Sequence, residues 1–142
     1  MVNISEKSPT RRIARAEAVI TILATTARAL RSDSLQKGDA LATAKIAAIL
    51  GAKQTPSLVP LCHPVALTGV DVAIKVGPTR VTLTVTAETI GQTGVEMEAM
   101  VGASTGALAL YDMVKSIDRT AHFSVRLLTK SGGRSGSWKR GS

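Results

Sequence analysis

Aromatic residues are almost absent from this chain, which has one Phe, one Tyr and one Trp among 142 residues. Proteins that bind single-stranded nucleic acid usually stack bases on aromatic rings, so this scarcity argues against such a function. A core with so few rings must be built from aliphatic side chains. Many alanines and glycines would let neighbouring backbones approach closely within it.

Cysteine and long apolar runs are also scarce. The single cysteine, Cys62, excludes an intramolecular disulfide and fits a reducing compartment. The N-terminal residues lack the apolar core of a signal peptide, and no apolar run reaches membrane-spanning length. We therefore expect a cytoplasmic protein with no membrane partner. Its length indicates a single domain over residues 1–142, with flexible ends at 1–14 and 131–142.

Acidic residues are outnumbered: 10 Asp and Glu stand against 18 Lys and Arg, giving a net charge of +8. Such an excess of positive charge favours an anionic partner. No zinc-finger spacing or basic helix points to nucleic acid, so a phosphorylated metabolite is the favoured partner. A basic nucleic-acid-binding module and a non-catalytic nucleotide-binding protein remain as alternatives.

Hydrophobic periodicity predicts an α+β protein. Asp39 is the expected N-cap of one helix, and Gly51 its expected C-terminal stop. The predicted elements are a strand over residues 15–22, helices over 24–32 and 40–50, strands over 70–76 and 81–85, a helix over 95–117 and a strand over 123–127. This β-α-β-β-α-β order predicts an antiparallel sheet with helices on one face.

Reactive side chains concentrate in two motifs, the first being Leu61-Cys62-His63-Pro64. His63 lies in a proline-bounded loop and can transfer protons near neutral pH, although a structural hydrogen bond would also explain it. Adjacent residues of an extended chain point apart, so His63 is poorly placed to activate Cys62 as a nucleophile. A small buried side chain is the simpler interpretation of Cys62. One cysteine and two histidines are too few for a zinc site.

The second motif, Glu96-Met97-Glu98, opens the long predicted helix. Favourable interaction with the helix dipole explains Glu96, whereas Glu98 lies between apolar residues and is the better catalytic candidate. Asp112 and Lys115, three residues apart, share a face near the other end of this helix. They form either a surface ion pair or a unit that transfers protons.

Helix length separates these candidates. Glu98 and Asp112 are fourteen residues apart, or about 21 Å along one helix, so they cannot reach one small reacting centre within a single chain. Gly102 and Gly106 on the same helix favour close packing of another backbone, which we interpret as a second subunit. The sequence therefore predicts a site shared between two subunits.

Together, several motifs resemble the cyclic pyranopterin monophosphate synthases, the C proteins of molybdenum cofactor biosynthesis. The resemblance runs from Met1 to about Gly136 and departs at Asn3, where the family usually has aspartate. The matching motifs are Lys37-Gly38-Asp39, Ala44 to Ala47, Leu58 to Pro64, Thr93 to Ala99, Tyr111 to Met113 and Val125 to Gly133.

The resemblance implies a ferredoxin-like subunit, assembled as a homohexamer that is a trimer of dimers. It implies a cyclised guanosine triphosphate as substrate and diphosphate as a product. The catalytic residues that it implies are Lys37, Asp112 and Lys115. The substrate-binding residues that it implies are Leu61, Cys62, His63, Glu96, Met97, Glu98 and Lys130. No protein-built metal site or other cofactor is expected, although Mg²⁺ is compatible with the substrate phosphates.

Overall fold

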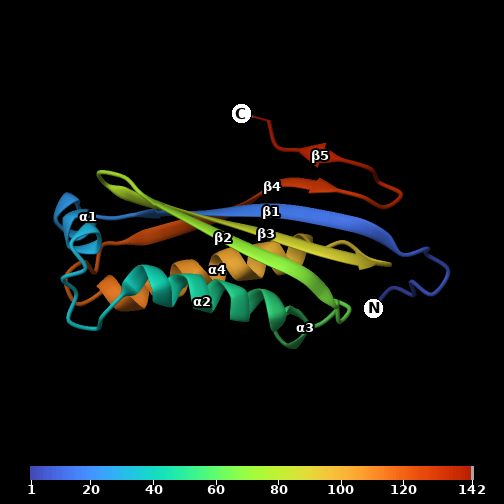
Figure 1. The fold of residues 1–142 in the computed structure, drawn as a ribbon, viewed down its shortest axis with the longest axis horizontal. Coiled ribbons are helices and arrows are strands. Elements are labelled where there is room, and N and C mark those ends of the chain that lie inside the picture. The colour runs from blue at the N-terminus through green and yellow to red at the C-terminus, as the bar shows by residue number, and fades with distance from the viewer. Residues whose placement is uncertain (142) are drawn as a thin grey trace.

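Five antiparallel strands carry a helical layer on one face in the computed structural model, which describes residues 1–141 (Figure 1). The elements are β1 (Thr10–Thr21), α1 (Ala24–Arg31), α2 (Ala40–Lys53), α3 (Thr55–Leu58), β2 (Leu67–Val76), β3 (Arg80–Gly91), α4 (Glu96–Val114), β4 (His122–Ser131) and β5 (Trp138–Lys139). The strand order is β2-β3-β1-β4-β5. The first four of these strands have the ferredoxin-like order, which confirms the predicted fold class.

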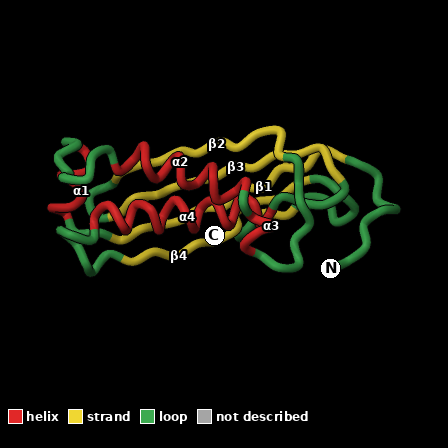
Figure 2. Tube along the Cα trace, turned by 90° about the horizontal axis from the view of Figure 1, so that it is seen from below, coloured by secondary structure: helices red, strands yellow, loops and turns green. Residues whose placement is uncertain are grey.

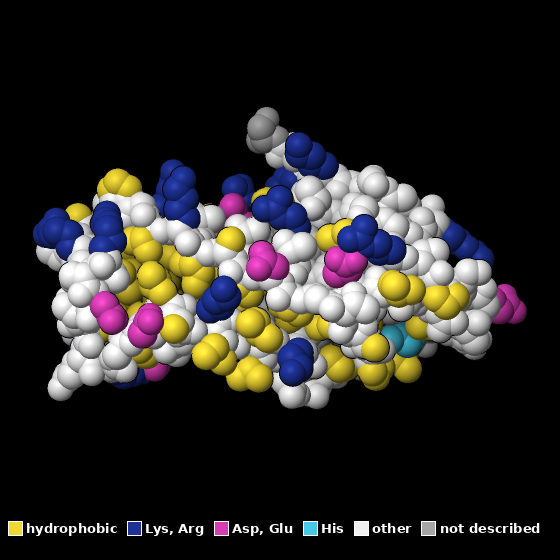
Figure 3. Space-filling view, in the orientation of Figure 1, with side chains coloured by type: hydrophobic (Ala, Val, Ile, Leu, Met, Phe, Trp, Pro, Cys, Tyr) yellow, Lys and Arg dark blue, Asp and Glu magenta, His cyan; other side chains and the backbone are white. Residues whose placement is uncertain are grey.

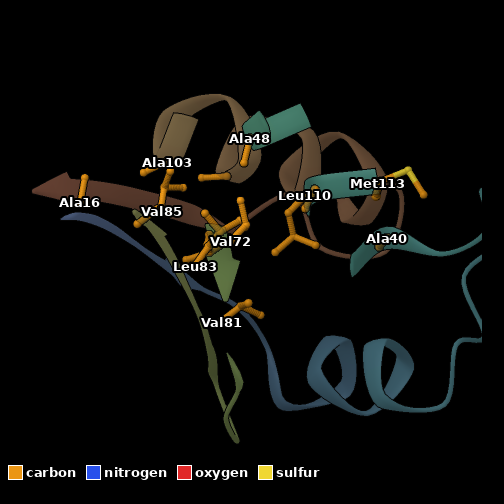
Figure 4. Close-up of a cluster of buried hydrophobic side chains, with 14 of the residues drawn as sticks. Ala16, Ala40, Ala48, Val72, Val81, Leu83, Val85, Ala103, Leu110 and Met113 are labelled. Atoms are coloured by element: carbon orange, nitrogen blue, oxygen red, sulfur yellow. The ribbon is translucent and has the colours of Figure 1, made fainter. Parts of the chain in front are cut away.

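The core lies between the sheet and the two long helices. Helix α2 packs on β2, and α4 packs across β1, β3 and β4, so the helices lie side by side beneath the strands (Figure 2). Alternate residues of β1, including Ala16, Ala18 and Ile20, are fully buried, as their period of two predicts. Leu83 and Val85 of β3 meet Ala103 of α4 in the same cluster (Figure 4). Among residues 1–141, no helix has the length and apolarity needed to span a membrane.

Glycines on α4 allow its close contact with α2. A Cβ atom built at Gly102 would lie 2.9 Å from the Ala48 carbonyl oxygen, and one at Gly106 would lie 3.1 Å from that of Ala44. The predicted close backbone approach is therefore confirmed, but its assignment to a second subunit is wrong. The neighbouring backbone belongs to α2 of the same chain, which packs alongside α4 on the same face of the sheet.

Replacing Gly102 by alanine should destabilise the protein, although alanine is the better helix former by about 1 kcal/mol. The new methyl group meets a helix carbonyl that cannot rotate away, and overpacking of this kind costs about 1–3 kcal/mol. We expect a lower free energy of unfolding in urea titration. Gly69→Ala is the control, because a Cβ there meets nothing within 4 Å; equal stability of the two variants would contradict this packing.

Several predicted element boundaries are wrong. Strand β1 begins at Thr10 instead of residue 15, because its polar first residues pair through the backbone with the end of β3. Helix α2 passes through Gly51 to Lys53, since this glycine makes room for the Thr105 side chain. The short strand β5, which pairs with β4, was not predicted. Flexibility of the end segments and the single-domain organisation stay predictions, and Ser142 lies outside the described residues.

The end of the molecule that carries α1 is held by a buried carboxylate. Asp118, in the α4–β4 connection, accepts hydrogen bonds from the Leu23 backbone N–H at 2.8 Å and from the Thr26 and Thr120 hydroxyl groups at 3.0 and 2.8 Å. Burial alone would raise the pKa of Asp118, but these hydrogen bonds outweigh it and the pKa is lowered. Because Leu23 lacks a capping side chain, Asp118 caps α1 from a distant part of the sequence.

Candidate active site

Two lysines hold one carboxylate at the C-terminal end of α4. The Lys37 Nζ donates to Oδ2 of Asp112 at 2.8 Å and to its backbone carbonyl oxygen at 3.1 Å. The Lys115 Nζ lies 2.6 Å from the other carboxylate oxygen, Oδ1. Each oxygen of Asp112 therefore has its own ammonium group. The face shared by Asp112 and Lys115 was predicted, and the contact between Lys37 and Asp112 joins residues 75 positions apart.

The loop before α2 fixes the position of Lys37 in this cluster. Lys37 lies in the loop between α1 and α2, just before Gly38, whose φ of +99° other residues rarely adopt. Asp39 then caps α2 by accepting a hydrogen bond from the Ala42 N–H at 2.9 Å, as predicted. Because α2 packs along α4, the loop that precedes α2 places the Lys37 side chain beside the last turns of α4.

The cluster stays ionised over a wide pH range. Hydrogen bonds from Lys115 and then Lys37 lower the pKa of Asp112 to about 2, and the Asp112 carboxylate raises the pKa of Lys115. All three side chains are about half exposed, so the ion pairs contribute little to stability. Because these three charged groups are exposed and add little to stability, they are available to contact a ligand.

The titration of Asp112 is directly measurable. Its pKa is lowered, so whatever stability the ion pairs add is present above its ordinary value of 3.8 and is lost as pH falls through about 2. We expect the NMR shift of the Asp112 carboxyl carbon to titrate near 2, and to move back toward 3.8 in Lys115→Ala. A midpoint that Lys115→Ala leaves unchanged would contradict the pairing.

A second group of predicted residues lines a cavity of about 270 Å³ at the other end of α4. The side chains come from the loop after α3 and from the start of α4, and they include Leu61, Cys62, His63, Glu96, Met97 and Glu98. A Cβ built at Gly94 would collide with the Glu96 carboxylate, which therefore folds back over this glycine. The structure thus brings both opening motifs together, although roughly 30 residues separate them in the sequence.

The cavity raises the pKa of two of the side chains that line it. Glu98 is only 3% exposed, and its burial raises its pKa. A hydrogen bond from its own backbone N–H lowers the pKa, and the charge of Glu96 raises it further. Burial and the nearby Glu98 charge also raise the pKa of the Cys62 thiol. A raised pKa keeps Cys62 as a thiol, which agrees with the interpretation that it is no nucleophile. Glu98, by contrast, is a buried carboxyl group whose raised pKa suits it to proton transfer.

These two groups lie at opposite ends of one chain. Helix α4 spans the molecule, with α1 and the loop that carries Lys37 near one end and α3 near the other (Figure 1). The distance from Glu98 to Asp112 along the helix is about 21 Å, as expected from the sequence. Within one chain the structure therefore does not bring the catalytic candidates together with the candidate substrate-binding residues.

Lys130 belongs to a basic region beside the second group. Its Nζ contacts the Ser135 hydroxyl, next to a cavity of about 510 Å³ whose lining includes Lys7, Arg12 and Arg134. The sequence interpretation missed Arg12, which it placed in a flexible arm. Arg12 donates to the carbonyl oxygens of Gly91 and Gln92 at 2.8 and 3.2 Å and is therefore fixed before α4 begins. The adjacent Arg11 and Arg12, just before the alternating strand pattern, could have indicated a basic site here.

No protein-built metal site is apparent in residues 1–141, where no three His, Cys, Asp or Glu side chains are grouped so that they could hold an ion. The side chains of the two groups can supply proton transfer and the binding of anions. Asp112 with its two lysines and Glu98 with His63 are the groups for proton transfer. Lys130 and Arg12 stand in the basic region, where a phosphate chain would be favoured.

Comparison with known proteins gives a consistent result over nearly the whole chain. The model of the MoaC family matches residues 1–133. The chain is 48% identical over 141 residues to the cyclic pyranopterin monophosphate synthase of Streptomyces griseus, covering 99% of this chain and 80% of that protein. It is 47% identical over 141 residues to cyclic pyranopterin monophosphate synthase 2 of Mycobacterium bovis, with coverage of 99% and 84%.

Proposed function

The chain belongs to the MoaC family and has the activity of a cyclic pyranopterin monophosphate synthase in molybdenum cofactor biosynthesis, and we propose a substrate and residue roles for it. The proposed substrate is (8S)-3′,8-cyclo-7,8-dihydroguanosine 5′-triphosphate. The guanine-derived ring opens and closes again as a pterin. A hydroxyl oxygen of the substrate then attacks the α-phosphorus, and the bond from that phosphorus to the departing diphosphate breaks.

The observation that carries the role assignment is the pair of lysines on Asp112. Two ammonium groups and a carboxylate in direct contact can accept and return protons while a ring opens and closes. Lys37, Asp112 and Lys115 are therefore the proposed catalytic residues. The pKa of about 2 at Asp112 keeps this carboxylate charged, so it serves as a partner for the lysines and not as the acid itself.

The residues at the other end of α4 are proposed to bind the substrate. His63 and Glu98 hold the pterin and ribose portion, with Leu61, Cys62, Glu96 and Met97 around it. The Glu98 carboxyl group can accept a hydrogen bond from a ring N–H, or donate one to a ring nitrogen or oxygen when it carries a proton. Lys130 binds the phosphates and stabilises the charge that develops on the departing diphosphate. Mg²⁺, if required, would accompany the phosphates.

A complete site needs both groups of residues, so we propose that each site is formed by two subunits. The separation of about 21 Å along α4 is too large for one pterin ring to reach both ends of a single chain. A homohexamer built as a trimer of dimers, in the cytoplasm, is the assembly that the family resemblance suggests.

The test of the function is a product assay on the purified protein. Incubation with the cyclised triphosphate should release one diphosphate per pterin product, both measured by chromatography. A non-catalytic nucleotide-binding protein would bind the triphosphate and release no diphosphate. A nucleic-acid-binding module would instead retain RNA or DNA on filters with an affinity that falls steeply between two salt concentrations.

A further inference from the structure

The C-terminal hairpin, formed by β4, the loop over residues 132–137 and β5, has a part to which the proposed function gives no role. Strand β5 turns back along β4 and pairs with it at two positions, Thr129 with Lys139 and Lys130 with Trp138. It lies at the edge of the sheet opposite β2 (Figure 1). The match to the MoaC family model ends at residue 133, before this strand begins.

Arg140 fastens β5 to the rest of the sheet. Its backbone N–H donates to the Leu128 carbonyl oxygen at 2.8 Å, and its Nε donates to the Leu127 carbonyl oxygen at 2.7 Å. Its guanidinium group also lies 5.6 Å from the centroid of the Trp138 ring, within the range of a cation–π contact. A two-stranded pairing this short is marginally stable by itself, so these contacts hold the hairpin closed.

The loop of the hairpin lies against the arginines at the start of β1. A Cβ atom built at Gly132 would collide with the Arg11 carbonyl oxygen, and one at Gly133 would collide with the Arg12 guanidinium group. The loop therefore packs directly on this pair of residues. It also forms part of the wall of the basic cavity of about 510 Å³, so the position of the loop sets the shape of that cavity.

Strand register places Lys130 and Trp138 side by side on one face of the sheet. Residues directly opposite each other in an antiparallel pair point to the same side. Lys130 lies opposite Ala14, which is fully buried on the helical side, and also opposite Trp138. The Lys130 Nζ contacts the Ser135 hydroxyl in the loop. Lys130 is therefore held between β5 and the loop, and its position depends on the closed hairpin.

We propose that Arg140 and Trp138 are positioning residues for phosphate binding. They hold the hairpin closed and so keep Lys130, and the loop over Arg12, in place for the phosphate groups of the substrate. The inference rests on the proposed function, which gives Lys130 its role as a phosphate ligand. Both residues act through Lys130 and the loop, so their loss should weaken phosphate binding and leave proton transfer at Asp112 unchanged.

Binding of inorganic triphosphate, measured by titration calorimetry at one fixed salt concentration, tests this role without turnover. Arg140→Ala should weaken the affinity about tenfold, because hydrogen bonding by a charged donor is lost. Lys and Arg side chains gather at this upper edge of the molecule (Figure 3), so the loss of one positive charge needs its own control. Arg28→Ala, on α1, is that control and should bind within about twofold of the unmodified protein, because distant charges are screened.

Steady-state kinetics separate positioning from a general loss of structure. The KM for the cyclised triphosphate should rise about tenfold in Arg140→Ala and about threefold in Trp138→Ala, with kcat unchanged in both. Trp138→Phe should keep KM close to that of the unmodified protein, because a phenyl ring preserves the cation–π contact. A fall in kcat together with the thermal unfolding midpoint, with KM unchanged, would overturn the positioning role.

Lys130→Ala distinguishes failure of this inference from failure of the proposed function. If Lys130→Ala weakens binding of inorganic triphosphate and Arg140→Ala does not, the positioning role is overturned and the phosphate role of Lys130 stands. If neither variant changes the affinity, both roles are overturned. Equal losses in Arg140→Ala and Arg28→Ala would also overturn the positioning role, because the change in net charge would then explain both.

Discussion

Asp112→Ala should abolish turnover without unfolding the protein. The change removes the acceptor that holds both Lys37 and Lys115, and loss of positioned acid–base groups costs about 10²–10⁴-fold in rate. Because all three residues act as one unit, we expect a loss near the top of that range, and a similar loss for Lys37→Ala. The measurement is the rate of pterin product formation at saturating substrate.

Stability provides the control for this result. Exposed ion pairs contribute little to folding, so the thermal unfolding midpoint of Asp112→Ala should stay close to that of the unmodified protein. Asp71→Ala, which removes an exposed carboxylate from β2, should retain full activity. Near-normal turnover in Asp112→Ala or Lys37→Ala would refute the assignment of the catalytic residues.

Mixing two inactive variants should restore activity. If Asp112→Ala and Glu98→Gln chains are coexpressed, about half of the dimers contain one chain of each kind, and each of these has one site with both residues intact. The expected activity is therefore about one quarter of the unmodified level, against almost none for either variant alone. This restoration follows only if Asp112 and Glu98 of one site come from different chains.

The pair Asp112→Ala and Lys37→Ala is the matched control for mixing. These two residues contact each other within one chain, so every site of a mixed dimer still lacks one of them. No activity should return. Equal restoration by both pairs would mean that the chains exchange segments or that the grouping of residues is wrong.

Local patterns predicted the fold class because each element has a strong periodic signal. The alternation around Ala16 and Ile20 identified β1, and Asp39 identified the start of α2. Element ends were less predictable, since they depend on partners elsewhere in the chain. Thr10 begins β1 because Gly91 lies opposite, and α2 passes Gly51 because Thr105 packs there.

Parts of the candidate site could also be predicted. The spacing of Asp112 and Lys115 fixed their common face, and helix length fixed their separation from Glu98. The approach of Lys37 to Asp112 has no local signal, because it depends on the packing of α2 along α4. Arg12 was missed for the same reason, as the carbonyl groups that hold it come from a loop about 80 residues away. The resemblance to the family supplied Lys37 where periodicity did not.

The shared site is tested most directly by a crystal structure with the cyclised triphosphate, or a purine triphosphate that is not turned over, bound to Asp112→Asn. The ring system should contact His63 and Glu98 of one chain, and the Lys37 and Lys115 ammonium groups beside the same ligand should come from another chain. A ligand whose protein contacts all come from a single chain would contradict the account.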